Sequence, residues 1–274
     1  MIRVLVSGAG GKMGSEVRRA VTAADGMELV AAVDPGAASS LIASGDSETV
    51  EYHASLEEAI AATSPDVIVD FTHPSVVEAN VRIAMAAGVD TVLAAMSAGV
   101  DLVLGTTGLS EEKLAELAHL APDSTTLFFA PNFAIGAVLM MQFAEKAARF
   151  MPHVEVTEFH HDKKADAPSG TAIRTARLIA AARANVPDAP GRETELPGME
   201  GARGALVEGV SVHSVRLPGL VAHQEVLFGG QGQTLTIRHD SLDRSSFMPG
   251  VLLGVRNIAS RPGLSLGIDD LLGI

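Results

Sequence analysis

The densest group of polar side chains in the sequence lies at residues 158–171, which read EFHHDKKADAPSGT. Two histidines and two lysines fall within residues 160–164. Histidine titrates near neutral pH and can donate or accept a proton, while lysine offers a point charge to a carboxylate or a proton to a reacting atom. The Ser-Gly-Thr at 169–171 is typical of a helix N-terminus, whose hydroxyls and free N–H groups bind anions. The segment therefore predicts a site for a small dicarboxylate with a protonation step beside it.

Simpler readings of the same residues stay open at this point. The run 162–164 (DKK) has the composition of a solvated charged turn, and Ser169 and Thr171 are also ordinary helix caps. A metal site is not predicted, because no His-Glu-x-x-His motif occurs and the adjacent His160 and His161 diverge in an extended chain.

A glycine-rich turn at Gly8–Gly14 follows the first apolar run and precedes a helical pattern. Its spacing is G-x-x-G-x-x-G rather than G-x-G-x-x-G, and a plain strand–helix turn would use the same residues. Asp34, 20 residues beyond Gly14, ends the next apolar run, where an acid binds the adenine ribose of NAD. Pro35 follows instead of an arginine for a 2′-phosphate, although Lys12 could serve one. We predict a dinucleotide site that accepts NADH at least as well as NADPH.

Short apolar runs alternate with helical patterns in the first half of the chain. This order predicts right-handed crossovers and a Rossmann-type, doubly wound parallel sheet. The predicted strands are 2–7, 28–34, 66–71, 101–104 and 126–130, and the predicted helices are 13–24, 76–87 and 110–121.

The second half has strands that alternate apolar and polar residues, at 154–159, 210–215 and 234–238, with predicted helices at 171–184 and 246–260. Alternation indicates one covered face and one face open to solvent or a partner, which favours a smaller α+β domain with a mixed or antiparallel open sheet. We predict a dinucleotide-binding domain at 1–131 and a substrate-binding and oligomerisation domain at 132–241. The C-terminal helix and tail, 242–274, are expected to return to the first domain.

Residues 83–93 and 94–104 are near copies of each other, with eight of eleven positions identical. Only the second copy runs directly into a Gly-Thr-Thr-Gly turn at 105–108. We therefore assign the strand to the second copy, and expect the first to lengthen the preceding helix or loop.

Composition excludes several classes of function. The 274 residues carry a net charge of −13 with no cysteine, no tryptophan and one tyrosine. These values argue against thiol chemistry, disulfides and nucleic-acid binding. The longest charge-free stretch, 124–144, is interrupted by Pro131-Asn132 and is better explained by a strand, a turn and a buried helix than by a membrane span. We expect a cytoplasmic protein that binds neither membrane nor nucleic acid.

Taken together, these motifs resemble the 4-hydroxy-tetrahydrodipicolinate reductase (dihydrodipicolinate reductase) family over nearly the whole chain. The stretch 219–225 (GLVAHQE) is similar to the actinobacterial branch of that family, whereas the near copy at 83–104 departs from the family pattern. The motifs that carry the resemblance are 8–14 (GAGGKMG), 70–74 (DFTHP), 105–108 (GTTG), 130–133 (APNF) and 160–171 (HHDKKADAPSGT).

The resemblance implies roles for individual residues. His160 matches the family's acid/base histidine and Lys164 its proton-donating lysine, while Lys163 falls on a variable position and is not carried over. Substrate-carboxylate contacts are implied for His161, Ser169, Gly170 and Thr171. Cofactor contacts are implied for Gly8, Ala9, Gly10, Gly11, Lys12, Met13, Asp34, Gly105, Thr106, Thr107, Ala130, Pro131, Asn132 and Phe133.

The implied reaction is the NAD(P)H-dependent reduction of 4-hydroxy-tetrahydrodipicolinate in the diaminopimelate route to lysine. Loss of the 4-hydroxyl as water gives a conjugated imine, hydride from the nicotinamide then adds at substrate C4, and the resulting enamine is protonated at C3. The family forms homotetramers through sheets of the second domain. Two alternatives share the dinucleotide half: another NAD(P)-dependent reductase of an amino-acid-derived imine or carbonyl, and a non-catalytic dinucleotide sensor. The segment 160–171 discriminates between them, because a sensor has no use for a paired histidine and lysine.

Overall fold

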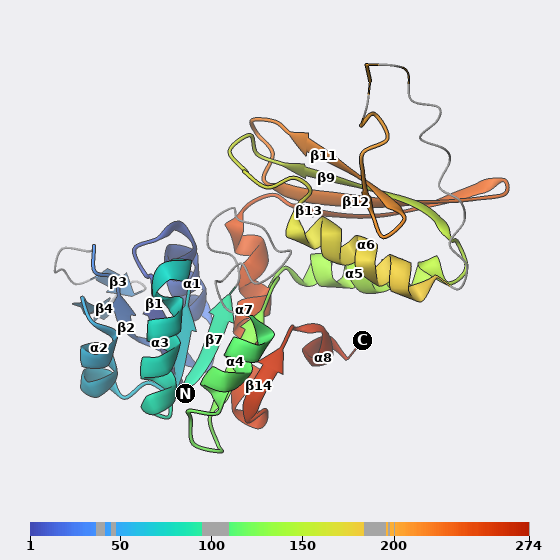
Figure 1. The fold of residues 1–274 in the computed structure, drawn as a ribbon. Coiled ribbons are helices and arrows are strands. Elements are labelled where there is room, and N and C mark those ends of the chain that lie inside the picture. Colours follow the sequence, from blue (N-terminus) through green and yellow to red (C-terminus); the bar gives the residue numbers. More distant parts are fainter. Residues whose placement is uncertain are drawn as a thin grey trace. The chain divides into compact units, whose positions relative to one another are not determined.

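The computed structural model describes residues 1–36, 42–44, 48–94, 110–183, 196, 198–199 and 201–273. Within these residues the chain forms two compact units. The first contains the described residues up to 135 together with 244–273, and the second contains those of 136–243. Figure 1 shows the helices and strands of each unit.

The first unit is built on a seven-stranded sheet in which every pair of neighbours is parallel. Strand β6 is buried along its whole length, as expected where helices cover both faces of a parallel sheet. In spatial order the strands are β14 (Gly263–Leu266), β8 (Thr126–Ala130), β7 (Asp90–Ala94), β6 (Val67–Asp70), β1 (Ile2–Ser7), β2 (Met27–Val33) and β5 (Tyr52–His53). A separate hairpin pairs β3 (Ile42–Ser44) with β4 (Glu48–Val50).

The strand order reverses at β1, with β2 on one side of it and β6 on the other. The last residues of these strands lie in register, because Ser7 pairs with Val33 and with Asp70. The loops that follow the three strands therefore leave from one edge of the sheet. In open α/β sheets this edge, at the point of reversal, is where ligands bind.

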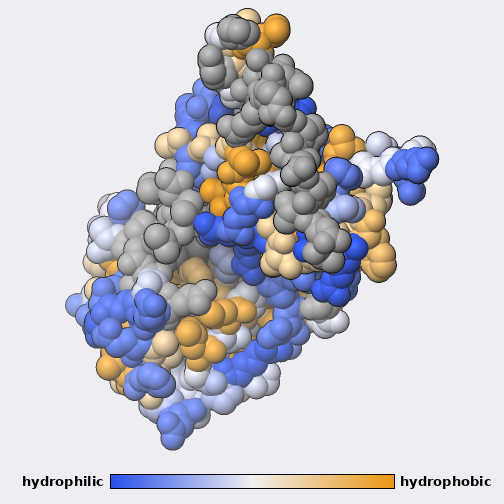
Figure 2. All heavy atoms as spheres, turned by 45° about the vertical axis from the view of Figure 1, so that its right-hand side comes forward, coloured by the Kyte–Doolittle hydropathy of each residue, from blue (hydrophilic) through white to orange (hydrophobic). Residues whose placement is uncertain are grey.

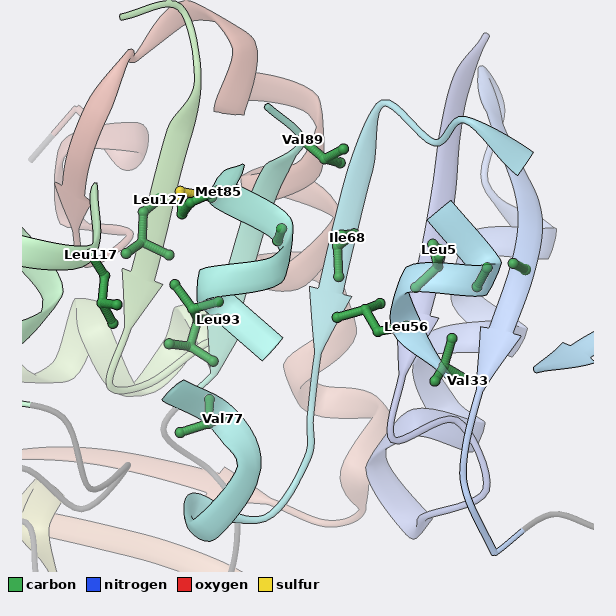
Figure 3. Packing of buried hydrophobic residues seen from close by; sticks show 14 of the residues in the cluster. Leu5, Val33, Leu56, Ile68, Val77, Met85, Val89, Leu93, Leu117 and Leu127 are labelled. Carbon is green, nitrogen blue, oxygen red and sulfur yellow. The ribbon is translucent and has the colours of Figure 1, made fainter. Parts of the chain in front are cut away.

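A hydrophobic core lies between the sheet and the layer of helices α2, α3 and α4. Figure 3 shows Leu5, Ile68 and Leu93 of the sheet packed against Leu56, Val77 and Leu117 of these helices. The helices of the first unit are α1 (Lys12–Ala23), α2 (Leu56–Thr63), α3 (Pro74–Ala86), α4 (Glu111–Ala118), α7 (Met248–Asn257) and α8 (Asp269–Leu272), with 3-10 turns η2 (Arg244–Phe247) and η3 (Ile258–Ser260).

The second unit is a five-stranded mixed sheet with helices on one face (Figure 1). Val156, Val226 and Phe228 point to the covered face and are fully buried, while their neighbours along each strand alternate to the open face. The strands in spatial order are β10 (Ala205–Val207), β11 (Val210–Arg216), β9 (His153–His160), β12 (Ala222–Gly230) and β13 (Gln233–Ser241). The helices are α5 (Ile135–Ala148) and α6 (Gly170–Ala182).

The predicted fold class, a doubly wound parallel sheet plus a smaller α+β unit, is confirmed. The assignment of the near copies is wrong for the first copy. Residues 90–93 of strand β7 (Asp90–Ala94) belong to that copy, and the strand pairs with both β6 and β8. The physical reason is that α3 ends at Ala86 and the glycine two residues later, Gly88, has a φ of 68°. This left-handed conformation ends the helix and directs the chain into the sheet. The second copy, apart from Ala94, lies outside the described residues.

No helix among the described residues combines the length and apolar content needed to cross a bilayer. On the face drawn in Figure 2, hydrophilic and hydrophobic residues are interspersed.

The close approach of α7 to the end of β8 generates a stability prediction. A Cβ added at Gly250 would lie 2.0 Å from the carbonyl oxygen of Phe133, so Gly250→Ala forces α7 away from this backbone. We expect the free energy of unfolding to fall by about 1–3 kcal/mol despite the better helix propensity of alanine. Gly229→Ala is the control, since nothing lies within 4 Å of a Cβ there. Equal urea midpoints for the two variants would contradict the packing argument.

Candidate functional site

The turn after β1 requires glycine at two positions for steric reasons. Gly8 has a φ of 74°, and a Cβ there would lie 2.7 Å from the carbonyl oxygen of Phe71. A Cβ at Gly14 would lie 2.1 Å from the carbonyl oxygen of Gly8, because the first turn of α1 packs directly on the loop. The glycines therefore let strand, turn and helix approach one another more closely than any side chain permits.

The N-terminus of α1 is uncapped and faces outward. No side chain caps the helix at Gly11, and its first turn has no acidic residue. Gly10, Gly11 and Lys12 are exposed, whereas Ala9 is buried. The first N–H groups of a helix have no partners within the helix and carry a partial positive charge, so this end suits an anion such as a diphosphate.

Asp34, the residue after β2, lies against the same loop. Its Oδ2 accepts the N–H of Gly10 at 2.8 Å and its Oδ1 accepts the N–H of Gly36 at 3.0 Å. A Cβ on Gly10 would come within 2.6 Å of Oδ2, so the loop residue must be small for the carboxylate to reach it. A carboxylate has about four acceptor positions. Asp34 can therefore hold the loop and still accept hydrogen bonds from a ribose diol.

A buried acid anchors the neighbouring strand end. Asp70, the last residue of β6, accepts hydrogen bonds from the N–H and hydroxyl of Thr72 (2.9 and 2.6 Å) and from the amide of Asn80 (2.8 Å). Asn80 also reaches the hydroxyl of Ser7 at 3.4 Å. This network joins the ends of β1 and β6 to α3, and so stiffens the edge of the sheet from which the glycine turn leaves.

The segment after β8 is positioned by packing. The ring of Phe133 is fully buried, with its centroid 6.4 Å from that of Phe71 and 6.2 Å from that of Phe128. Asn132 accepts the N–H of Ala134 at 2.9 Å, and Pro131 and Asn132 are half-buried. The predicted cofactor residues Gly105, Thr106 and Thr107 lie outside the described residues.

In the second unit, His160 is the last residue of β9 and its Nδ1 is hydrogen-bonded to Oε2 of Glu158. Glu158 is fully buried and also accepts the N–H of Ser169 at 3.2 Å. Arg216 donates to both of its carboxylate oxygens, at 2.9 and 2.8 Å. Burial alone raises the pKa of Glu158, but hydrogen bonds from His160, Arg216 and Ser214 outweigh it and lower the pKa to about 2. Glu158 is therefore an anion at neutral pH.

Lys164 has a carboxylate partner of its own. Its Nζ lies 2.6 Å from Oδ1 of Asp166, and the two side chains are 17% and 5% exposed. Their mutual attraction is stronger here than at an open surface, because little water screens the pair. The backbone N–H of Lys164 also donates to the carbonyl of His161 at 3.2 Å, which closes a turn directly after β9. Lys163, by contrast, is exposed.

Ser169 caps helix α6 and is already engaged. Its Oγ accepts the N–H of Ala172 at 3.3 Å, and its own N–H is taken by Glu158. Gly170 is buried, Thr171 is half-buried, and the peptide bond between Ala167 and Pro168 is cis. The hydrogen of the Ser169 hydroxyl is left to donate to another group, because Oγ can accept one bond and donate another.

Several predicted site residues are brought together within each unit. The glycine turn and Asp34 meet at one edge of the first sheet. In the second unit, His160 and Ser169 share the carboxylate of Glu158 at the start of α6, and Lys164 pairs with Asp166 in the loop between β9 and α6. Sequence reasoning missed Glu158, Asp166 and Arg216. Strand alternation could have found Glu158, which shares a face with His160. Nothing in the sequence alone indicates Arg216.

The low pKa of Glu158 makes acid stability testable. Lowering a pKa from 4.5 to about 2 adds stability that is complete above pH 4.5 and is lost as pH falls toward 2. We expect the free energy of unfolding to drop by about 3 kcal/mol across this window through Glu158 alone, and Glu158→Gln to lack that part of the drop. Glu155→Gln is the control, because Glu155 is on the same strand but 34% exposed. Urea titrations at stepped pH measure the drop, and parallel curves for wild type and Glu158→Gln would contradict the assignment.

Two family models match this chain, one for each half. The family model described as dihydrodipicolinate reductase, N-terminus, matches residues 2–133, and that described as dihydrodipicolinate reductase, C-terminus, matches residues 136–272. The chain is 50% identical over 275 residues to the 4-hydroxy-tetrahydrodipicolinate reductase of Mycobacterium sp. (strain JLS), covering 100% of both chains. It is 52% identical over 280 residues to that of Nocardia farcinica (strain IFM 10152), covering 100% of this chain and 99% of the relative.

A solved structure shows the same similarity in three dimensions. The dipicolinate-bound dihydrodipicolinate reductase from Paenisporosarcina sp. TG-14 superposes with a TM-score of 0.79 at 41% identity, covering 98% of this chain and 99% of that one. The family models match both halves of the chain, the relatives match its full length, and the solved structure matches its fold. The chain therefore belongs to the dihydrodipicolinate reductase family.

Proposed function

We propose that this chain reduces 4-hydroxy-tetrahydrodipicolinate to tetrahydrodipicolinate with NADH or NADPH, in the diaminopimelate route to lysine. The observation that carries the proposal is the histidine at the end of β9. His160 is hydrogen-bonded to a buried carboxylate, and Lys164 nearby in sequence is held by a carboxylate of its own. Such a pair suits proton delivery to a substrate atom. The names of the relatives supply the substrate.

The residues that would hold the cofactor belong to the first unit and its loops. Gly8 to Met13 would bind the pyrophosphate at the start of α1, and Asp34 would bind the adenine ribose. Gly105, Thr106 and Thr107, with the segment 130–133, would border the nicotinamide. For Phe133 this contact would be made by the backbone, since its ring is buried. The bound dinucleotide supplies the hydride of the reaction.

The substrate carboxylates would be bound by His161, Ser169, Gly170 and Thr171. The contact between Lys164 and Asp166 bears on this assignment, because the lysine charge is balanced within 2.6 Å. Hydroxyl and N–H donors at the start of α6, with exposed His161, are then the main partners for a carboxylate. Dipicolinate, bound by the Paenisporosarcina reductase, is a planar dicarboxylate and supports this class of ligand.

Protonation is the step that the chain's own side chains would perform. His160 and Lys164 would hold the proton and deliver it to substrate C3. Both are mostly buried, with side chains 15% and 17% exposed, so bulk water competes little for the proton.

We also propose that the chain forms a homotetramer through the open face of the five-stranded sheet. Leu206 and Leu227 are 48% and 42% exposed there, on strands whose opposite faces are covered by helices. Apolar side chains on an unpaired sheet face are typical of an association surface.

Replacing the two proposed proton donors tests the mechanism. We expect His160→Gln or Lys164→Ala to lower kcat by about 10²–10⁴-fold, the contribution of a well-placed general acid, while the Kd for NADH stays within about two-fold. Steady-state kinetics with enzymatically generated substrate and fluorescence titration of NADH measure the two quantities.

Lys163→Ala is the matched control, because Lys163 belongs to the same turn as Lys164 but its side chain is exposed. Near-normal turnover in both test variants would refute the assigned roles. NADH binding without turnover in the wild-type chain would favour a dinucleotide sensor instead.

The residue after β2 decides the cofactor preference. The Asp34 carboxylate would repel the 2′-phosphate of NADPH, so we expect kcat/KM with NADH to equal or exceed that with NADPH. Asp34→Asn should weaken NADH use by about ten-fold, the effect of one lost charged hydrogen bond, and narrow the difference between cofactors. Exposed Asp25→Asn is the control. A strong NADPH preference in the wild type would overturn the role of Asp34.

A further inference from the structure

The carboxylate of Glu158 determines which nitrogen of His160 can exchange a proton. An ionised carboxylate only accepts hydrogen bonds, and Nδ1 of His160 is the ring atom that meets it. Nδ1 must therefore carry a hydrogen whether the imidazole is neutral or charged. Nε2 is left as the atom that takes up and releases the proton.

The groups on the elements next to His160 are either uncharged or paired with other residues, so Glu158 is its hydrogen-bonding partner among them. On β11, Arg216 pairs in register with His160 but directs its guanidinium to Glu158. On β12 the residue in register is Ala222, which in turn pairs with Ser241 of β13, and neither is charged. In the loop, Lys164 is paired with Asp166. Among the described residues, Glu158 is the ionisable side chain hydrogen-bonded to His160.

Arg216 joins this histidine to the loop that carries the lysine. Besides its two bonds to Glu158, the guanidinium donates to the backbone carbonyl of Asp166 at 2.6 Å. The side chain of Asp166 in turn lies 2.6 Å from Nζ of Lys164. The Arg216 guanidinium is therefore linked to His160 through the Glu158 carboxylate, and to Lys164 through Asp166. His160 lies on a strand, whereas Lys164 lies on the loop that follows it.

We propose that Glu158 is a positioning residue that holds His160 as the Nδ1–H tautomer, and that Arg216 fixes this carboxylate relative to the Lys164 loop. The inference rests on the proposed function in one respect, which is that His160 hands a proton to the substrate. Glu158 itself touches neither substrate nor cofactor in this proposal. The low pKa of Glu158 agrees with it, because an anion is present over the whole working range of pH.

The experiment reads the tautomer directly. Long-range ¹H–¹⁵N spectra of the full-length chain with labelled histidine distinguish a protonated ring nitrogen from a bare one, and His160→Gln identifies the signals. We expect neutral His160 in the wild type to carry its hydrogen on Nδ1, and Glu158→Gln to give a mixture of tautomers. We also expect kcat to fall by about 10–100-fold in Glu158→Gln, part of the general-acid contribution, with KM for NADH within about two-fold.

A second variant covers the case in which Glu158→Gln does not fold. Glu158→Leu combined with Arg216→Met removes both members of the buried pair and leaves no unpaired buried charge. The same mixture of tautomers and the same loss of kcat are expected. Circular dichroism verifies the fold of each variant.

Glu155→Gln is the matched control. Glu155 lies on the same strand as Glu158 and, like it, is hydrogen-bonded to a histidine, His213, and an arginine, Arg203. It should leave the His160 signals and kcat unchanged and shift the signals of His213. A hydrogen on Nε2 of neutral wild-type His160, or a kcat for Glu158→Gln equal to that of the control, would overturn the proposal. A wild-type chain that does not reduce the substrate would refute the proposed function, while the tautomer would still decide the role of Glu158.

Discussion

A carboxylate shut off from water must find hydrogen-bond donors within the protein, since burying an unpaired charge costs several kcal/mol. Glu158 meets this demand with donors from three segments: His160 on its own strand, Arg216 on the next strand, and the N–H of Ser169 at the start of α6. The demand therefore ties β9, β11 and α6 together at one end of the second sheet. The residues proposed to handle proton and substrate lie at this junction, so their rigidity follows from satisfying one buried charge.

The first unit reaches comparable rigidity by another route. At the glycine turn the decisive factor is the absence of side chains, because Gly8 and Gly14 let backbone atoms approach to distances that a Cβ would forbid. Asp34 adds a single carboxylate that holds the loop through N–H groups. An anion site made of backbone donors needs no excess of basic residues, which explains how a chain of net charge −13 could bind a dinucleotide.

In the second unit, the basic side chains of the candidate site form ion pairs with acids. Lys164 and Arg216 are each matched by a buried or nearly buried acid, Asp166 and Glu158. The cluster is therefore close to neutral, apart from the proton that His160 can hold. In the proposed function, such a site would bind a dicarboxylate through placed donors more than through net positive charge, and the His160 imidazole would be the group that changes its protonation state.

The sequence by itself determined the alternation of strands and helices, the glycine turn with Asp34, and the family to which the segment 160–171 belongs. These features depend on residues that are close in sequence, so their spacing can be read from the sequence directly. Tertiary structure alone showed that the first near copy, 83–93, supplies a strand, since its local propensities are almost the same as those of 94–104 and β7 is identified by its pairing with β6 and β8. It also decided the partner of Glu158: Arg216 lies 58 residues away, and only the register of β11 on β9 brings it beside His160. Local chemistry can be inferred from spacing, whereas contacts between distant segments depend on strand register, which two separate stretches of sequence do not encode on their own.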